Sequence, residues 1–153
     1  MEIKDNVLCY YAAHNDFYIY LERFSDKWSD NNTLIETVRN NEIVLSDADG
    51  YTNSINILNV EPENNLFKSS YYFNHFDNNI RGYIPSYVEL QIIENDITAI
   101  NNFLTLNGKE TIDLHDCWVS EMFDEQNAWT SDGIYKEKNT VLNYYVFGRR
   151  IKV

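Results

Sequence analysis

The sequence predicts an α+β domain in which one or two main helices pack on a twisted antiparallel sheet. An amphipathic helix is expected over residues 87–106, where apolar side chains recur at helical spacing. Its apolar stripe consists of Leu90, Ile93, Ile97, Ile100 and Leu104. Runs rich in β-branched and aromatic residues lie near both ends of the chain, over 7–21 and 118–153. Helices and strands therefore occupy separate stretches of the chain, which favours this class over an alternating α/β fold.

Length and charge narrow the possible functions. At 153 residues the chain is expected to form a single domain, 1–153, that buries a core of its own. A formal net charge of −12 argues against nucleic-acid binding, because phosphates are bound by Lys and Arg. The apolar run Val7–Ala13 is too short to cross a membrane, and no signal peptide is visible, so we expect synthesis in a cytoplasm. The 12 Tyr suit either a recognition surface or ordinary strand positions.

The N-terminal part is predicted to be β-rich. Val7–Ala13 and Phe17–Leu21 are expected to form a hairpin around His14, Asn15 and Asp16. We expect residues 24–28 to fold back as a loop or a single helical turn.

Two short strands are predicted next, at 33–38 and 42–45. Residues 1–45 are then a β-rich part suited to docking on a partner, and 46–153 form the core of the domain.

The middle of the chain contains the main helices. Apolar and polar residues alternate weakly over 54–60, which favours a strand. The spacing of the apolar and aromatic residues over 66–76 fits a short helix buried on one face. Ser86 stands three residues before Glu89, which is the spacing of a capping box and predicts a helix start. From there the sequence allows one long helix, or two stacked helices with a break near Asn95–Asp96.

Asn107–Gly108 is predicted to end the helix, because glycine readily adopts the left-handed cap. Beyond it an antiparallel meander is expected. Its strands are 118–122, 126–131, 133–137 and 142–153. Asp132–Gly133 is the strongest hairpin signal of the chain.

No pattern of catalytic, metal-binding or cofactor-binding residues stands out. Cys9 and Cys117 form no C-x-x-C pair, and the three His show no metal-ligand spacing. His115 lies two residues before Cys117, so a contact is possible, but Cys117 is expected to be a buried thiol. We therefore predict no catalytic residues, no metal and no cofactor, and a protein that is not an enzyme.

The order of several short motifs resembles a known family. These are Gly82-Tyr-Ile-Pro-Ser-Tyr-Val-Glu-Leu90, the helix with its Asn-Gly stop, Trp118-Val-Ser-Glu121, Ala128-Trp129 and the final strand from Asn143 to Val153. Over about residues 49–153 the chain resembles the DUF1566-type domains of gut Bacteroidetes and their phages. Those domains are similar to the variable proteins of diversity-generating retroelements. Residues 6–30 also resemble the short hairpin that precedes such domains.

The resemblance implies a C-type-lectin-like fold. Formylglycine-generating enzymes have a similar fold, but they depend on a paired-cysteine copper site near the C-terminus. No cysteine follows Cys117 here, so the enzyme interpretation is disfavoured. In the resembling family, ligand-facing residues lie between the W-x-S-E segment and the last strand. Carried onto this chain, the resemblance implies that the ligand-facing residues are among Asp124, Gln126, Asn127, Trp129, Ser131, Tyr135, Lys136, Asn143 and Tyr145.

The expected function is a non-enzymatic binding or structural module. Because no signal peptide is visible, we expect a phage virion-associated head or tail protein, either a decoration or a receptor-binding protein, made in the host cytoplasm, rather than a secreted bacterial adhesin. It is expected to be a homo-oligomer or to dock on other virion proteins, and to contact a glycan or a host receptor. The alternative is a lectin-like protein of a bacterial surface that binds glycans or proteins. Neither function involves nucleic acid or a membrane.

Overall fold

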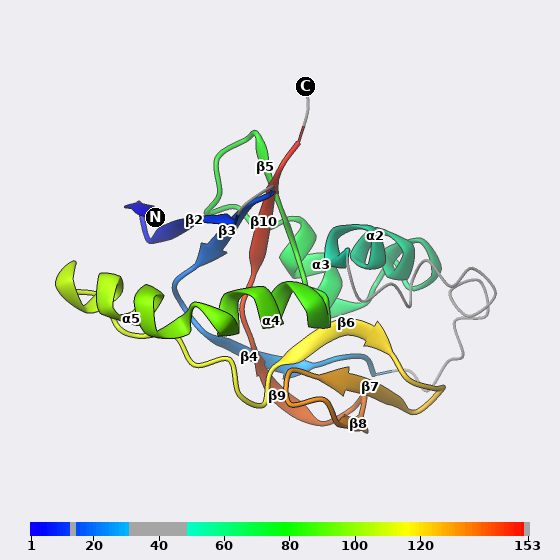
Figure 1. Cartoon of the computed structure of the whole chain (residues 1–153). Helices are drawn as coiled ribbons and strands as arrows, with labels where there is room; N and C mark the ends of the chain where they lie inside the picture. The colour runs from blue at the N-terminus through cyan, green and yellow to red at the C-terminus, as the bar shows by residue number, and fades with distance from the viewer. Residues whose placement is uncertain (13–14, 31–48, 152–153) are drawn as a thin grey trace.

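The computed structural model describes residues 1–12, 15–30 and 49–151. Helices and antiparallel strands occur together in this part of the chain, so the predicted α+β class is confirmed. A five-stranded sheet forms the centre. Its strands, in spatial order, are β1 (Glu2–Lys4), β2 (Val7–Ala12), β3 (Asn15–Tyr20), β10 (Phe147–Arg150) and β5 (Ile80–Tyr83). Strand β3 from the N-terminal part of the chain and strand β10 from its C-terminal part therefore lie side by side in one sheet (Figure 1).

Strands β2 and β3 form the predicted N-terminal hairpin. Their register runs from Val7 opposite Tyr20 to Ala12 opposite Asn15. The predicted loop was too long, because Asn15 and Asp16 already belong to β3. The loop residue His14 lies outside the described part of the chain.

Both faces of the hairpin are buried, which explains its nearly continuous apolar sequence. Leu8 and Ile19 belong to the apolar cluster that includes Leu90 and Ile100. The alternate residues Tyr18 and Tyr20, together with Cys9, belong to a second cluster. Successive side chains of a strand point to opposite faces, so β2 and β3 contribute to both clusters at once.

The main helical region consists of two helices, α4 (Tyr87–Asn95) and α5 (Ile97–Leu106). Of the two predicted alternatives, the pair of helices is therefore confirmed and the single long helix is wrong. Helices α4 and α5 follow each other end to end across the molecule (Figure 1). The break falls at Asp96, where the Tyr10 hydroxyl donates a hydrogen bond to the Asp96 carboxylate. The residue between the two helices is therefore bound by a side chain of β2, which is far away in the sequence.

Helices α2 (Gly50–Val60) and α3 (Asn65–Tyr71) cover another part of the core. The expected strand at 54–60 was wrong, because this segment belongs to α2. The Asp49 carboxylate accepts a hydrogen bond from the Thr52 amide at 3.0 Å and caps this helix. Helix α3 confirms the predicted short helix, but it ends at Tyr71 rather than near residue 76.

A three-stranded antiparallel sheet lies at the lower end of the molecule in Figure 1. It consists of β6 (Trp118–Met122), β7 (Asn127–Thr130) and β8 (Tyr135–Glu137). These strands confirm most of the predicted meander. Gly133 has φ 76° and its amide donates to the Thr130 carbonyl at 3.1 Å, so the predicted Asp-Gly hairpin is confirmed.

The last predicted strand, 142–153, was wrong in its extent and its place. It is divided into β9 (Val141–Tyr144), which pairs with β4 (Phe24–Lys27), and β10, which pairs with β3 and β5. Residues 24–27 are therefore a strand and not the expected loop or helical turn. The predicted strands at 33–38 and 42–45 lie outside the described residues.

Candidate functional site

The Trp118–Glu121 segment of β6 contacts both strand β4 and the start of helix α4. The buried Trp118 indole donates to the Asp26 carbonyl at 3.0 Å. Next to it, the Glu121 carboxylate accepts from the Tyr87 amide at 2.9 Å and from the Ser120 hydroxyl at 3.0 Å. Tyr87 is the first residue of α4, where a negative charge is favourable because backbone N–H groups point outward there. This segment therefore fixes the position of the three-stranded sheet against α4.

A second buried carboxylate, Glu89, joins three elements. Its oxygens accept from the Ser86 amide at 2.9 Å, the Gly50 amide at 2.7 Å and the Tyr83 hydroxyl at 2.8 Å. The first bond completes the predicted capping box, which is confirmed. Burial raises the pKa of Glu89, and the hydrogen bonds from Ser86, Gly50 and Tyr83 oppose that shift. Glu89 is only 3% exposed, so this carboxylate stabilises the fold rather than facing a ligand.

The outer face of the three-stranded sheet presents a different surface. In β7, Ala128 and Thr130 are fully buried, whereas Asn127 and Trp129 point outward and are partly exposed. Trp129 pairs with Tyr135 and Asn127 with Glu137 across the strands, so these four side chains share one face.

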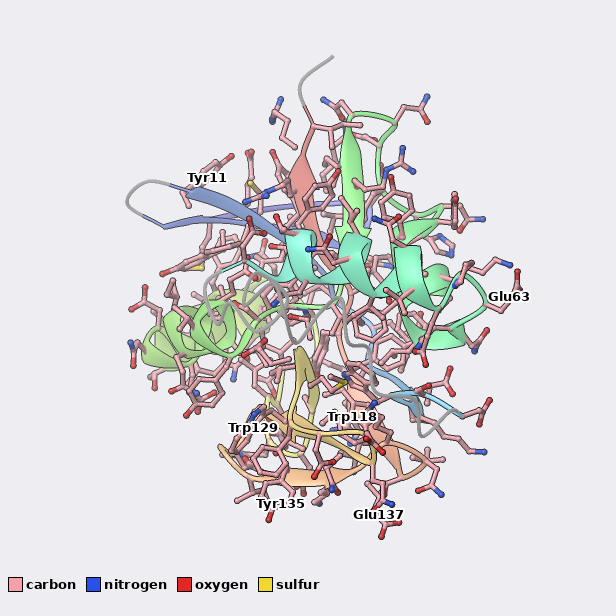
Figure 2. All side chains as sticks on the ribbon, turned by 90° about the vertical axis from the view of Figure 1, so that its right-hand side faces the viewer. Tyr11, Glu63, Trp118, Trp129, Tyr135 and Glu137 are labelled. Carbon is pink, nitrogen blue, oxygen red and sulfur yellow. The ribbon has the colours of Figure 1, made fainter. Side chains whose placement is uncertain are left out.

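Three aromatic rings on this face contact one another, and we name them the aromatic platform: Phe123, Trp129 and Tyr135. The Phe123 and Tyr135 rings are stacked, with centroids 4.1 Å apart and planes inclined by 6°. The Trp129 ring meets both edge-on, at 5.1 Å and 5.7 Å. Phe123 is 45% exposed and Tyr135 is 49% exposed. Trp129 and Tyr135 lie side by side at the lower end of the molecule, far from Tyr11 (Figure 2).

Acidic and amide groups border the platform. One Asp124 oxygen accepts from the Gln126 amide at 2.9 Å and from the Asn127 amide at 2.8 Å, which holds the turn between β6 and β7. Burial would raise the pKa of Asp124, but these hydrogen bonds outweigh it and lower that pKa. Glu125 and Glu137 are exposed nearby, so the border is negatively charged.

The other predicted ligand-facing residues lie elsewhere. The Ser131 hydroxyl accepts from the Cys117 amide at 3.0 Å, and the Lys136 ammonium pairs with Asp116 at 3.3 Å. Asn143 is a partly buried residue of β9 and forms an isolated bridge with Cys117. Tyr145 is only 5% exposed, and its hydroxyl accepts from the Asp113 amide at 3.2 Å. The structure thus brings Trp129 and Tyr135 together, with Asp124, Gln126 and Asn127 beside them.

The prediction missed Phe123, which completes the platform. A large apolar residue directly before Asp124-Glu125-Gln126 was a usable signal, since an apolar side chain in a polar turn is often exposed. Its contact with Tyr135 could not be predicted, because it depends on the hairpin between β7 and β8.

Cys117, the thiol that lies two residues after His115, is buried. Burial raises the pKa of the Cys117 thiol to about 12, and its sulfur faces the backbone carbonyls of Asp113 and His115. Over residues 1–12, 15–30 and 49–151, no group of three or more His, Cys, Asp or Glu side chains is arranged to hold a metal ion. Within the same ranges, no helix is both long and apolar enough to cross a membrane.

Comparisons with protein-family models, with curated proteins and with solved structures gave no match to this chain.

Proposed function

We propose that this chain is a non-enzymatic binding module with a C-type-lectin-like fold, and that it binds its ligand on the aromatic platform. The fold assignment is supported by the capping box at Ser86 and by the Trp118–Glu121 segment, in which Glu121 binds the three-stranded sheet to the start of α4. The platform lies between that segment and the last strand, as the family resemblance implies for ligand-facing residues. The observation that carries the function is the mutual contact of three rings on one sheet face, of which Phe123 and Tyr135 are exposed and Trp129 is partly exposed.

The ligand class follows from the chemistry of this face. Aromatic rings stack on the apolar faces of sugars, and amides such as Gln126 bind hydroxyl groups. The carboxylates of Asp124, Glu125 and Glu137 repel anionic ligands. The platform therefore suits a neutral sugar residue of a glycan better than a sialylated or sulfated one.

A glycan array followed by titration of the best neutral ligand tests this proposal. We expect Trp129→Ala and Tyr135→Ala each to weaken binding by about tenfold, because each removes one stacking ring. Tyr72→Ala is the matched control, since Tyr72 is 65% exposed but lies at the end of α3. Equal affinity of the platform variants and the wild type would contradict the proposal, provided that circular dichroism shows all variants to be folded.

For the biological setting we propose a phage virion-associated decoration or receptor-binding protein, on the strength of the family resemblance. Several copies on a larger assembly would give weak sugar contacts a high avidity. The alternative is a lectin-like protein of a bacterial surface. Light scattering of the purified chain distinguishes the two: a closed oligomer supports the virion setting, and a stable monomer favours the free-standing lectin.

A further inference from the structure

A surface cleft lies away from the aromatic platform and is lined by residues of the connections that follow β3 and α5. Its volume is about 470 Å³, which is within the roughly 300–1,000 Å³ typical of small-molecule sites. We name it the charged cleft. Among its lining residues are Glu22, Arg23, Lys109, Glu110, Asp113 and Tyr145.

The charged side chains of this cleft form no close ion pairs with one another. Two cations and three carboxylates line it, yet no ion pair within 4.0 Å forms among these five side chains. The Lys109 ammonium instead donates to the Asn6 side-chain oxygen at 2.7 Å.

This absence of pairing is unusual for the molecule. Most described Lys and Arg side chains contact a carboxylate or an aromatic ring. Among the described residues, only Lys4, Arg23 and Lys109 contact neither. Two of these three line the same cleft, in a chain of net charge −12.

Tyr145 adds a hydroxyl group to the cleft. Its side chain is 5% exposed and its oxygen accepts from the Asp113 amide at 3.2 Å. The Arg23 charge lies close enough to act on this phenol. Within the described part of the chain no acceptor takes the phenolic proton, so Tyr145 has a donor available beside the two cations.

We propose that the charged cleft binds a small zwitterion with the chemistry of a free peptide or amino acid. Arg23, Lys109 and the Tyr145 hydroxyl bind its carboxylate through charge-assisted hydrogen bonds. The carboxylates of Glu22, Glu110 and Asp113 bind its ammonium group. Such a ligand satisfies both sets of charges, which the protein keeps apart. A purely anionic ligand would meet the three carboxylates without compensation.

The test uses alanylalanine as a probe, with binding followed by amide chemical shifts of the full chain. The controls are N-acetyl-alanylalanine, which lacks the ammonium group, and alanylalanine amide, which lacks the carboxylate. We expect alanylalanine to shift the amides of residues 21–23 and 109–113. Each blocked peptide should bind at least about tenfold more weakly, since it loses one charge-assisted contact.

Variants locate the contact. Arg23→Gln and Lys109→Gln should each weaken alanylalanine binding by about tenfold, whereas Lys4→Gln, which removes an unpaired lysine outside the cleft, should leave it unchanged. Absence of shifts at tens of millimolar probe would overturn the proposal, as would equal binding of the blocked peptides or unchanged binding by the two cleft variants. Because Trp129 and Tyr135 lie outside the cleft, this result is independent of the glycan experiment.

Discussion

The exposed His115 ring lies 3.3 Å from the Asp132 carboxylate, which also accepts from the Asp116 amide at 3.1 Å. The hydrogen bond to Asp132 is the main cause that raises the pKa of His115 above 6.5, and the charges of Asp113, Asp132 and Glu94 add to it. A raised pKa means that the folded state favours the imidazolium form. This contribution to stability is fully present below pH 6.5 and is lost as the pH rises through the pKa of the folded protein.

We predict that Asp132→Asn lowers the pKa of His115 towards its ordinary value. Titration of the His115 ring protons by NMR measures this directly. Asp30→Asn, which changes an acid paired with Lys27 at another place, should have no effect. An unchanged His115 pKa in Asp132→Asn would show that the other acids cause the shift.

Cys117 illustrates how burial controls reactivity. With its pKa raised to about 12 by burial, only a minute fraction of this thiol is ionised at pH 8. In a Cys9→Ser background, we therefore predict that a disulfide reagent labels Cys117 only after unfolding. Labelling of the native protein at the rate of a free thiol would contradict this and would reopen a nucleophilic role.

At the scale of elements, two glycines at helix ends are required for different reasons: Gly50 has no space for a side chain, and Gly108 has a left-handed backbone. A Cβ at Gly50 would lie 2.4 Å from the Ile84 carbonyl oxygen and 2.5 Å from the Ser86 nitrogen. Gly108 has φ 70° and a Cβ there would meet nothing within 4 Å. Gly50 therefore permits close packing of α2 on the turn before α4, whereas Gly108 provides the left-handed cap of α5.

We predict that Gly50→Ala destabilises the protein by about 3 kcal/mol or more, because backbone atoms must move. Gly108→Ala should lower stability by only about 1 kcal/mol, which is the strain of a left-handed alanine. Urea unfolding of both variants measures these differences. The reverse order would show that α2 can shift away from the turn before α4 at little cost.

The sequence predicted elements best where the decisive contacts are local. The Ser86–Glu89 box spans three residues, and the cap after α5 is closed by the Lys109 amide donating to the Leu104 carbonyl at 2.9 Å. Helix α2 was missed because its cap, Asp49 with Thr52, stands next to an alternating segment that favoured a strand.

At the scale of the whole molecule, β10 joins distant parts of the chain. Phe147 pairs with Ile19 on one side and with Tyr83 on the other. The described N-terminal hairpin is thus continuous with the central sheet. Whether it also docks on a partner stays a prediction.

We predict that deleting residues 147–153 prevents folding, because β3 and β5 lose the strand between them. Deleting residues 1–4 removes only the edge strand β1 and should leave a cooperative unfolding transition. Circular dichroism and thermal unfolding distinguish the two truncations. A cooperatively folded chain without β10 would show that the two apolar clusters suffice.

The sequence by itself determined the α+β class, the caps at Ser86 and Gly108 and the hairpins β2–β3 and β7–β8, because these depend on donors, acceptors and side-chain alternation within a few residues of each other. The expectation that Trp129 and Tyr135 belong to one candidate face came from the family resemblance. Only the tertiary structure decided the division of the last strand into β9 and β10, the burial of Tyr145 and the contact of Phe123 with Tyr135. It also decided the charged cleft, whose Arg23 and Lys109 are far apart in sequence. Such contacts form between segments that the chain brings together only on folding, so no local pattern could predict them.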